Sequence, residues 1–126
     1  MTKAPQKLGK VQLQIMQVLW QRGQATAREI TDDLCQNAPI AHSTVQTLLR
    51  KLEAKGAVAH DSDDRTFVFR PLYRQAEVSA SATRDLLERV FGGSVYGLVS
   101  HLLKNEAVSP EELARLRQLI DRETRG

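Results

Sequence analysis

The sequence has few aromatic residues, one cysteine and no long apolar run. Only 5% of its 126 residues are aromatic, so a folded core must be mostly aliphatic. The single cysteine, Cys35, has no partner for an internal disulfide, which favours a reducing compartment. No segment approaches the roughly 18 apolar residues of a membrane-spanning helix, and Met1–Lys7 does not begin a recognisable signal peptide. We therefore expect a cytoplasmic protein with no membrane partner.

The residue patterns of common catalytic and metal sites are also missing. His42, His60 and His101 are far apart in sequence, and Cys35 has no second cysteine at CxxC spacing. There is no Walker loop or dinucleotide fingerprint, and Ser94 is misplaced for a G-x-S-x-G elbow. We expect no enzyme activity, no catalytic residue, no metal site and no cofactor. Cys35 is expected to be a small buried residue.

The excess of positive charge is small and lies in the first part of the chain. The net charge is +3. Residues 1–73 contain ten Lys and Arg against seven Asp and Glu, whereas residues 74–126 contain eight of each. This modest basic bias is compatible with contacts to nucleic-acid phosphates but does not establish them.

Two helices are predicted before residue 40. Leu8–Arg22 has apolar residues at helical spacing, and Gly23 ends it. Thr26 is expected to cap a second helix, with Glu29 as its capping-box partner. Pro39 ends that helix, because proline disfavours helical geometry in the residue before it.

A third helix is predicted at Ser43–Lys55, with Ser43 and Gln46 as its capping box and Gly56 as its end. Its apolar stripe consists of Val45, Leu48, Leu49 and Leu52. Short polar residues followed by cations occupy the other face: Ser43, Thr44, Gln46, Thr47, Arg50 and Lys51, with His42 just before the helix. Three helices with short links indicate a helix-turn-helix, and this polar face suits a recognition helix. An ordinary amphipathic surface helix is the alternative for the helix taken alone.

A short β-hairpin is expected directly after this helix. Residues 57–60 and 66–70 have β character, and the polar run Asp61–Asp64 between them has turn chemistry. A hairpin at this place is a wing. Phe67 and Phe69 are expected to close the core, and Arg65 is expected to contact DNA backbone. Because aspartates repel phosphate, the wing is expected to make few other DNA contacts.

The remaining chain, residues 74–126, is expected to be a helical dimerisation domain, and residues 1–73 the DNA-binding domain. Ser94 and Ser109 are predicted helix caps. The apolar positions expected at the dimer interface are Leu86, Val90, Phe91, Leu98, Leu102, Leu103, Leu113, Leu116, Leu119 and Ile120. About fifty residues are too few to bury these stripes well, so a second copy of the chain is the expected partner. The alternative is a monomer whose last helices fold back on the first domain.

Four segments together resemble the penicillinase-repressor family of the BlaI/MecI type. The match covers about residues 8–119, and its motifs are Ile15–Trp20, Ser43–Gly56, Phe67–Pro71 and Phe91–Ser94. The resemblance implies a homodimeric winged-helix repressor on double-stranded operator DNA of two-fold symmetry. Carried over by position, Ser43, Thr44, Gln46, Thr47 and Arg50 would face the DNA. It also implies β-lactam-resistance or related stress genes as targets, with a sensor-linked protease that cleaves an Asn-Phe bond in the antibiotic-responsive members.

The sequence departs from that family pattern in three ways. It contains no Asn-Phe, and His101-Leu102 stands at the corresponding place. The C-terminal cysteine cluster of the copper-responsive members is missing, so a copper switch is not expected. The wing is acidic. This acidity and the modest net charge favour one alternative function, a winged-helix protein-interaction module that does not bind DNA.

Overall fold

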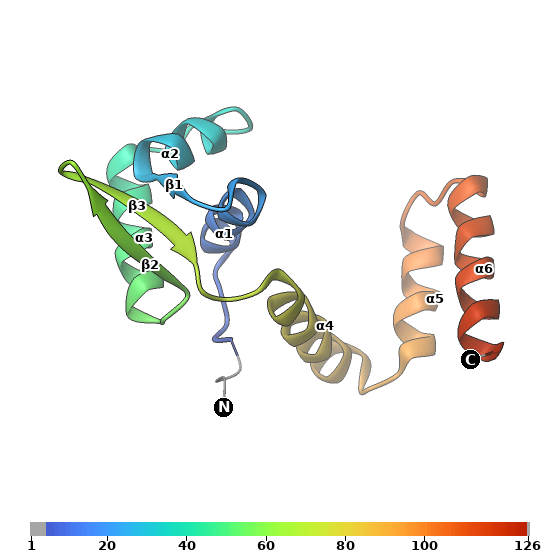
Figure 1. The fold of residues 1–126 in the computed structure, drawn as a ribbon. Helices are drawn as coiled ribbons and strands as arrows, with labels where there is room; N and C mark the ends of the chain where they lie inside the picture. The colour runs from blue at the N-terminus through green and yellow to red at the C-terminus, as the bar shows by residue number, and fades with distance from the viewer. Residues whose placement is uncertain (1–4, 126) are drawn as a thin grey trace. The chain divides into compact units, whose positions relative to one another are not determined.

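The computed structural model describes residues 5–125, so Met1–Ala4 of the segment tested for a signal peptide lie outside it. The chain divides into two compact units, residues 1–83 and 84–126. The described residues form six helices and one three-stranded antiparallel sheet (Figure 1). None of these helices combines the length and apolar character that crossing a membrane would need. The fold is mainly α with a small β-hairpin, as predicted.

The first unit begins with α1 (Lys10–Arg22), β1 (Ala25–Thr26) and α2 (Ala27–Cys35), and α2 is the first helix of the helix-turn-helix. Gly23 ends α1 with a φ of +84°, a conformation that suits glycine. The Thr26 hydroxyl accepts the Glu29 N–H at 3.1 Å, and the Glu29 carboxylate accepts the Thr26 N–H at 2.9 Å. The predicted capping box of α2 is therefore confirmed.

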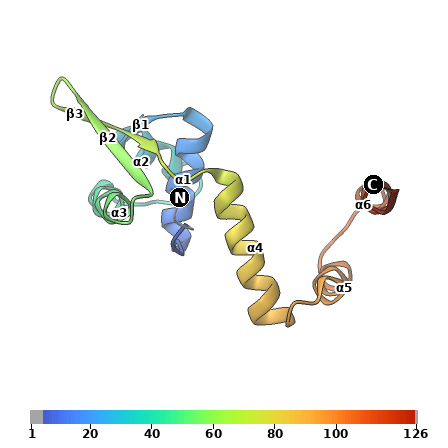
Figure 2. The same cartoon turned by 60° about the horizontal axis from the view of Figure 1, so that its bottom comes forward.

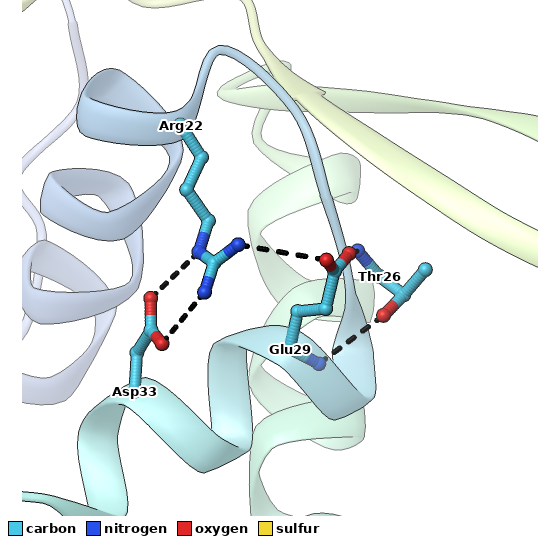
Figure 3. A network of polar contacts seen from close by, with 4 residues as sticks. All are labelled: Arg22, Thr26, Glu29 and Asp33. Carbon is cyan, nitrogen blue, oxygen red and sulfur yellow. Dashed lines mark hydrogen bonds and ion pairs between the residues drawn. The ribbon is translucent and has the colours of Figure 1, made fainter.

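An ion-pair network joins the end of α1 to α2 (Figure 3). The guanidinium of Arg22 donates to both oxygens of Asp33, at 2.7 and 2.8 Å, and approaches Glu29 at 3.5 Å. The hydrogen bonds from Arg22 and its positive charge lower the pKa of Asp33. The hydrogen bond from the Thr26 backbone is the main cause of the lowered pKa of Glu29. These contacts link the C-terminal end of α1 to the outer side of α2.

Asp33→Asn is expected to remove part of the acid sensitivity of folding. The pKa of Asp33 is lower in the folded chain than its ordinary value of 3.8, so its stabilisation is complete above that value and is lost as the pH falls through the folded pKa. Thermal unfolding from about pH 6 to about pH 2 measures this. The difference in the free energy of unfolding between wild type and Asp33→Asn should become smaller as the pH falls. Asp32→Asn, at an exposed neighbour, is the control and should keep the wild-type profile. A gap that stays constant to the lowest pH contradicts the assignment.

The third helix, α3 (His42–Ala54), begins one residue earlier than predicted. Ala41 is its N-cap, and no side chain caps it, so the predicted Ser43–Gln46 capping box is wrong. The reason is a contact between helices. Nδ1 of His42 lies 2.9 Å from the hydroxyl oxygen of Thr31 in α2, which holds His42 in the first turn of α3. The predicted end is confirmed, since Lys55 is the C-cap and Gly56 follows with a φ of +81°.

The wing consists of β2 (Val58–Asp63) and β3 (Thr66–Pro71), and β1 extends it to a sheet of order β1-β3-β2. The strands are longer than predicted, because only Asp64 and Arg65 form the turn. Their φ values of 51° and 70° are those of a two-residue type I′ turn. The predicted turn at Asp61–Asp64 is therefore wrong for its first three residues, which pair in β2. Figure 2 shows this end of the hairpin projecting from the unit.

The core of the first unit is aliphatic, and its largest fully buried side chains are Ile15, Met16, Leu19, Ile30, Val45, Leu49, Leu52 and Val58. Phe69 joins this core with 7% of its surface exposed, as predicted. Phe67 does not, since 49% of it is exposed and its ring stacks on His60 with centroids 4.0 Å apart. Cys35 is exposed at the end of α2, so its predicted burial is wrong. It falls on the outer side of the helix, where its thiol points to the carbonyl of Ile40.

Three helices follow the wing: α4 (Gln75–Phe91), α5 (Val95–Asn105) and α6 (Pro110–Arg125). The predicted caps are confirmed, since Ser94 accepts the Gly97 N–H and Ser109 accepts the Glu112 N–H. No residue of α5 or α6 is buried. Of the predicted dimer positions, Leu86, Val90, Leu102, Leu103, Leu113, Leu119 and Ile120 are exposed, and Phe91, Leu98 and Leu116 are half-buried. The apolar stripes are therefore at most partly covered in the single chain.

Candidate nucleic-acid interface

The exposed face of α3 carries the residues predicted to contact DNA. Val45, Leu49 and Leu52 are fully buried and anchor one side of the helix in the core. All six predicted contact residues in the helix are exposed on the other side: Ser43, Thr44, Gln46, Thr47, Arg50 and Lys51. A rigid helix with a buried anchor holds these polar groups at fixed positions, which sequence readout requires.

Two hydrogen bonds organise this face. The Thr47 hydroxyl donates to the carbonyl of Ser43 at 3.0 Å and accepts from the Arg50 guanidinium at 3.3 Å. Thr47 therefore orients Arg50, and its methyl group and one remaining acceptor lone pair are left for an outside contact. Ser43 and Gln46 have no side-chain hydrogen bond within residues 5–125. Because the capping box is absent, the hydroxyl of Ser43 and the amide of Gln46 are available for base edges.

His42 is half-buried and turned toward α2, away from the outer face of α3. The Thr31 hydroxyl donates its only hydrogen to the carbonyl of Ala27 at 2.8 Å, so it must accept at its contact with His42. Nδ1 of His42 is thus the donor, and in the neutral ring Nε2 remains as an acceptor. His42 both starts the helix and presents one polar atom beside it.

A groove of about 410 Å³ separates α3 from the wing. Arg28, Arg50 and Arg65 line it, and none of the three is paired with a carboxylate within residues 5–125. Its other lining residues include His42, Gln46, Leu49, Phe67 and Phe69. The groove thus brings four predicted contact residues together, whereas Ser43, Thr44, Thr47 and Lys51 are not among its lining residues.

Arg28 is the cation that sequence analysis missed. It lies in the first turn of α2, two residues after the Thr26 cap, and lines the same groove as Arg50 and Arg65. Its position after a helix cap in a helix-turn-helix was the available indication, since the first helix of that motif crosses the DNA backbone. Arginine side chains around an apolar floor suit a chain of phosphates and deoxyribose rings.

The fold and this surface define a class. Three helices followed by a hairpin, with a polar and cationic outer face on the third helix, form a winged helix-turn-helix transcriptional regulator. The penicillinase repressor family model matches residues 8–122. The chain belongs to the penicillinase repressor family.

Relatives with assigned roles are similar over nearly the whole chain. The penicillinase repressor of Bacillus licheniformis is 28% identical over 121 residues, which cover 96% of this chain and 94% of that protein. The methicillin resistance regulatory protein MecI of Staphylococcus aureus strain N315 is 20% identical over 116 residues, which cover 92% and 94%.

Solved structures agree with the fold. The DNA-binding domain of the repressor BlaI matches with a TM-score of 0.53 and 30% identity, covering 61% of this chain and 93% of that one. Monomeric Bacillus licheniformis BlaI in complex with the blaP half-operator matches with a TM-score of 0.51 and 30% identity, covering 61% and 93%. The hsRosR-S4 complex matches with a TM-score of 0.56 and 17% identity over 96% of this chain and 93% of that one, and supports the fold alone.

These findings give the general function. The chain is a DNA-binding transcriptional repressor, and its family is not one of enzymes. The alternative of a protein-interaction module that does not bind DNA finds no support among these relatives.

Proposed function

We propose that the chain is a cytoplasmic homodimeric repressor that occupies a pseudo-palindromic operator and blocks RNA polymerase. Each copy inserts α3 into a major groove, and the two helices lie about 34 Å apart, one turn of B-DNA. The observation that carries the proposal is the outward polar face of α3 on a buried apolar anchor. The complex of BlaI with a half-operator supports the same use of this domain.

Within each half-site the contact residues divide into two groups. Ser43, Thr44, Gln46 and Thr47 lie in the first part of α3 and meet base edges, with His42 beside them. Arg50, Lys51 and Arg65 meet phosphates, and Arg28 joins them because it lines the same groove. Base contacts give specificity, whereas phosphate contacts give position and most of the salt-dependent affinity.

Residues 1–73 bind DNA and residues 74–126 form the dimer in this proposal. The support is that seven of the ten predicted dimer positions are exposed and the other three only half-buried, and that α5 and α6 bury no residue in the single chain. Apolar patches of this kind mark interaction sites in soluble proteins. A second copy presents the same stripe and provides the second recognition helix that a two-fold operator needs.

The names of the relatives suggest the regulated genes. They concern penicillinase and methicillin resistance, so we propose that the operator controls β-lactam-resistance or related stress genes. A sensor-linked protease is the partner implied for release. Because the chain has no Asn-Phe, cleavage must use another bond of α5 or α6, and mapping fragments after induction tests this.

Gln46→Ala is expected to reduce the preference for operator over random duplex by about 10-fold, because one good base contact contributes about 1–3 kcal/mol. Thr47→Ala should act in the same direction, since it also releases Arg50. Lys51→Gln should weaken binding to both duplexes equally, because it removes a phosphate contact. Gel-shift titrations with an operator obtained by in vitro selection, and with a random duplex, measure both quantities. If Gln46→Ala and Thr47→Ala leave the preference unchanged, this face of α3 does not read sequence.

A further inference from the structure

Tyr73 lies where the chain leaves the DNA-binding part. It follows β3, which ends at Pro71, and precedes α4, which begins at Gln75. The backbone N–H groups of Leu72 and Tyr73 both point to the carbonyl oxygen of Ala57, at 2.8 and 3.3 Å. The side chain is half-buried and packs against the core. The start of the segment between β3 and α4 is therefore hydrogen-bonded to Ala57, the residue before β2.

The other contacts of Tyr73 reach two helices of the DNA-binding part. Its phenol hydroxyl donates to the carbonyl of Lys55, the C-cap of α3, at 3.1 Å and accepts the Gln6 N–H at 3.2 Å. Its carbonyl accepts the indole N–H of Trp20 in α1 at 2.9 Å. Lys55 in turn donates through Nζ to the amide oxygen of Gln12 at 3.1 Å. One residue thus connects the exit of the chain to the end of the recognition helix.

The phenol–carbonyl contact is directional, unlike the packing of α4. The Lys55 carbonyl is one of the last in α3 and has no partner within that helix, so the phenol satisfies it. Within α4, Val78 is the one buried residue, and it contributes non-directional packing near the start of the helix. The hydrogen bonds of Tyr73 therefore hold the segment between β3 and α4 against the C-terminal end of α3 and the residue before β2.

A small change in the direction of α4 relative to α3 has a large effect at the far end of α4. With its 17 residues the helix is about 25 Å long. A tilt of about 10° at its base moves the other end by about 4 Å, more than the roughly 3.4 Å between neighbouring base pairs. In a dimer held through the C-terminal helices, a tilt of this size would change the separation of the two recognition helices by about one base pair.

We propose that Tyr73 is a positioning residue that determines the half-site spacing the dimer accepts. The inference rests on the proposed homodimer. It assigns no DNA contact to Tyr73, because the residue acts only through the direction of α4 relative to α3. Loss of the phenol hydroxyl leaves α3 folded and each half-site intact, but widens the range of separations between the two copies.

Tyr73→Phe in the full chain tests the proposal, and Tyr96→Phe is the matched control. Tyr96 is the only other tyrosine, is 84% exposed, and its hydroxyl has no hydrogen bond within residues 5–125. The probes are the in vitro selected two-fold operator, its single half-site, and operators with one or two base pairs added to or removed from the spacer. Tyr73→Phe should lose about 5- to 10-fold of the preference for the selected spacing and keep half-site affinity within about two-fold. Tyr96→Phe should match wild type in both.

Each other outcome overturns the inference. An unchanged spacing preference means that Tyr73 does not position the dimer, and an equal loss on the half-site means that it only supports α3. If wild type itself shows no spacing preference, the homodimer proposal fails and the inference falls with it. A DNA-free readout separates these cases. Nitroxide labels at Lys51→Cys, in a Cys35→Ser background, should give a broader distance distribution between the two copies in Tyr73→Phe than in wild type.

Discussion

Raising the salt concentration from about 50 to about 200 mM is expected to weaken operator binding by about 10,000-fold. The reason is the number of cations at the interface. In the proposed complex Arg28, Arg50, Lys51 and Arg65 contact phosphates in each copy, which gives eight phosphate contacts for the proposed dimer. Each contact releases counterions and adds about −0.9 to the slope of log affinity against log salt, so the slope is about −7. Fluorescence anisotropy with a labelled operator at four or five salt concentrations measures it.

Single substitutions decide which cations contribute. Arg28→Gln and Lys51→Gln should each lower the steepness of that slope by about 2, because each removes one contact from both copies. Lys104→Gln is the control, since Lys104 is exposed on α5, which is not part of the DNA-binding unit, and its slope should equal that of wild type. A slope near zero for wild type would falsify the proposed phosphate contacts as a group. If only Arg28→Gln leaves the slope unchanged, the proposed phosphate contact of Arg28 is wrong and the other contacts stand.

Ile120→Asp is expected to raise the dissociation constant of the dimer by at least about 100-fold. Ile120 is 60% exposed in the single chain, so the substitution should change the stability of the folded monomer little. In the proposed dimer the substitution loses the burial of a large apolar side chain, about 1.5–3 kcal/mol, once in each copy. About 1.4 kcal/mol corresponds to a factor of ten. Sedimentation equilibrium measures the dimer, and gel shift should show weaker binding to the two-fold operator with unchanged affinity for a half-site.

Gln118→Asp on the same helix provides the matched control. Gln118 is exposed and lies about 200° around α6 from Ile120, on the side opposite the apolar stripe. It introduces the same charge outside the proposed interface, so its dimer should resemble wild type. Two results contradict the dimer model: a wild-type chain that sediments as a monomer at all concentrations, or two aspartate variants that behave alike.

Local chemistry made most elements of the fold predictable. Capping residues are neighbours in sequence, so the Thr26–Glu29 box, Ser94 and Ser109 were found from spacing alone. The buried stripe of α3 follows from helical periodicity, because residues three and four apart share a face. The family resemblance rested on such local motifs and is confirmed over residues 8–122.

The errors arose where a distant contact outweighed a local preference. Ser43 has the right neighbours for a cap, but the bond from His42 to Thr31 moves the start of α3 and leaves Ser43 and Gln46 unengaged. Strand alternation predicts that Phe67 is buried with Phe69, yet the core reaches only as far as Phe69 and leaves Phe67 49% exposed. The side of α2 on which Cys35 falls depends on how that helix packs, which one cysteine near a helix end does not reveal.

The sequence by itself determined the helices, the wing, the family and the polar face of α3, because these follow from periodicity and from chemistry within a few residues. Tertiary structure alone decided that Arg28 joins Arg50 and Arg65 around one groove, and that Tyr73 ties the exit of the chain to α3. The hydroxyl of Tyr73 contacts residues 18 and 67 positions away in the sequence, and the three arginines belong to different elements. Only packing of the whole unit brings them together.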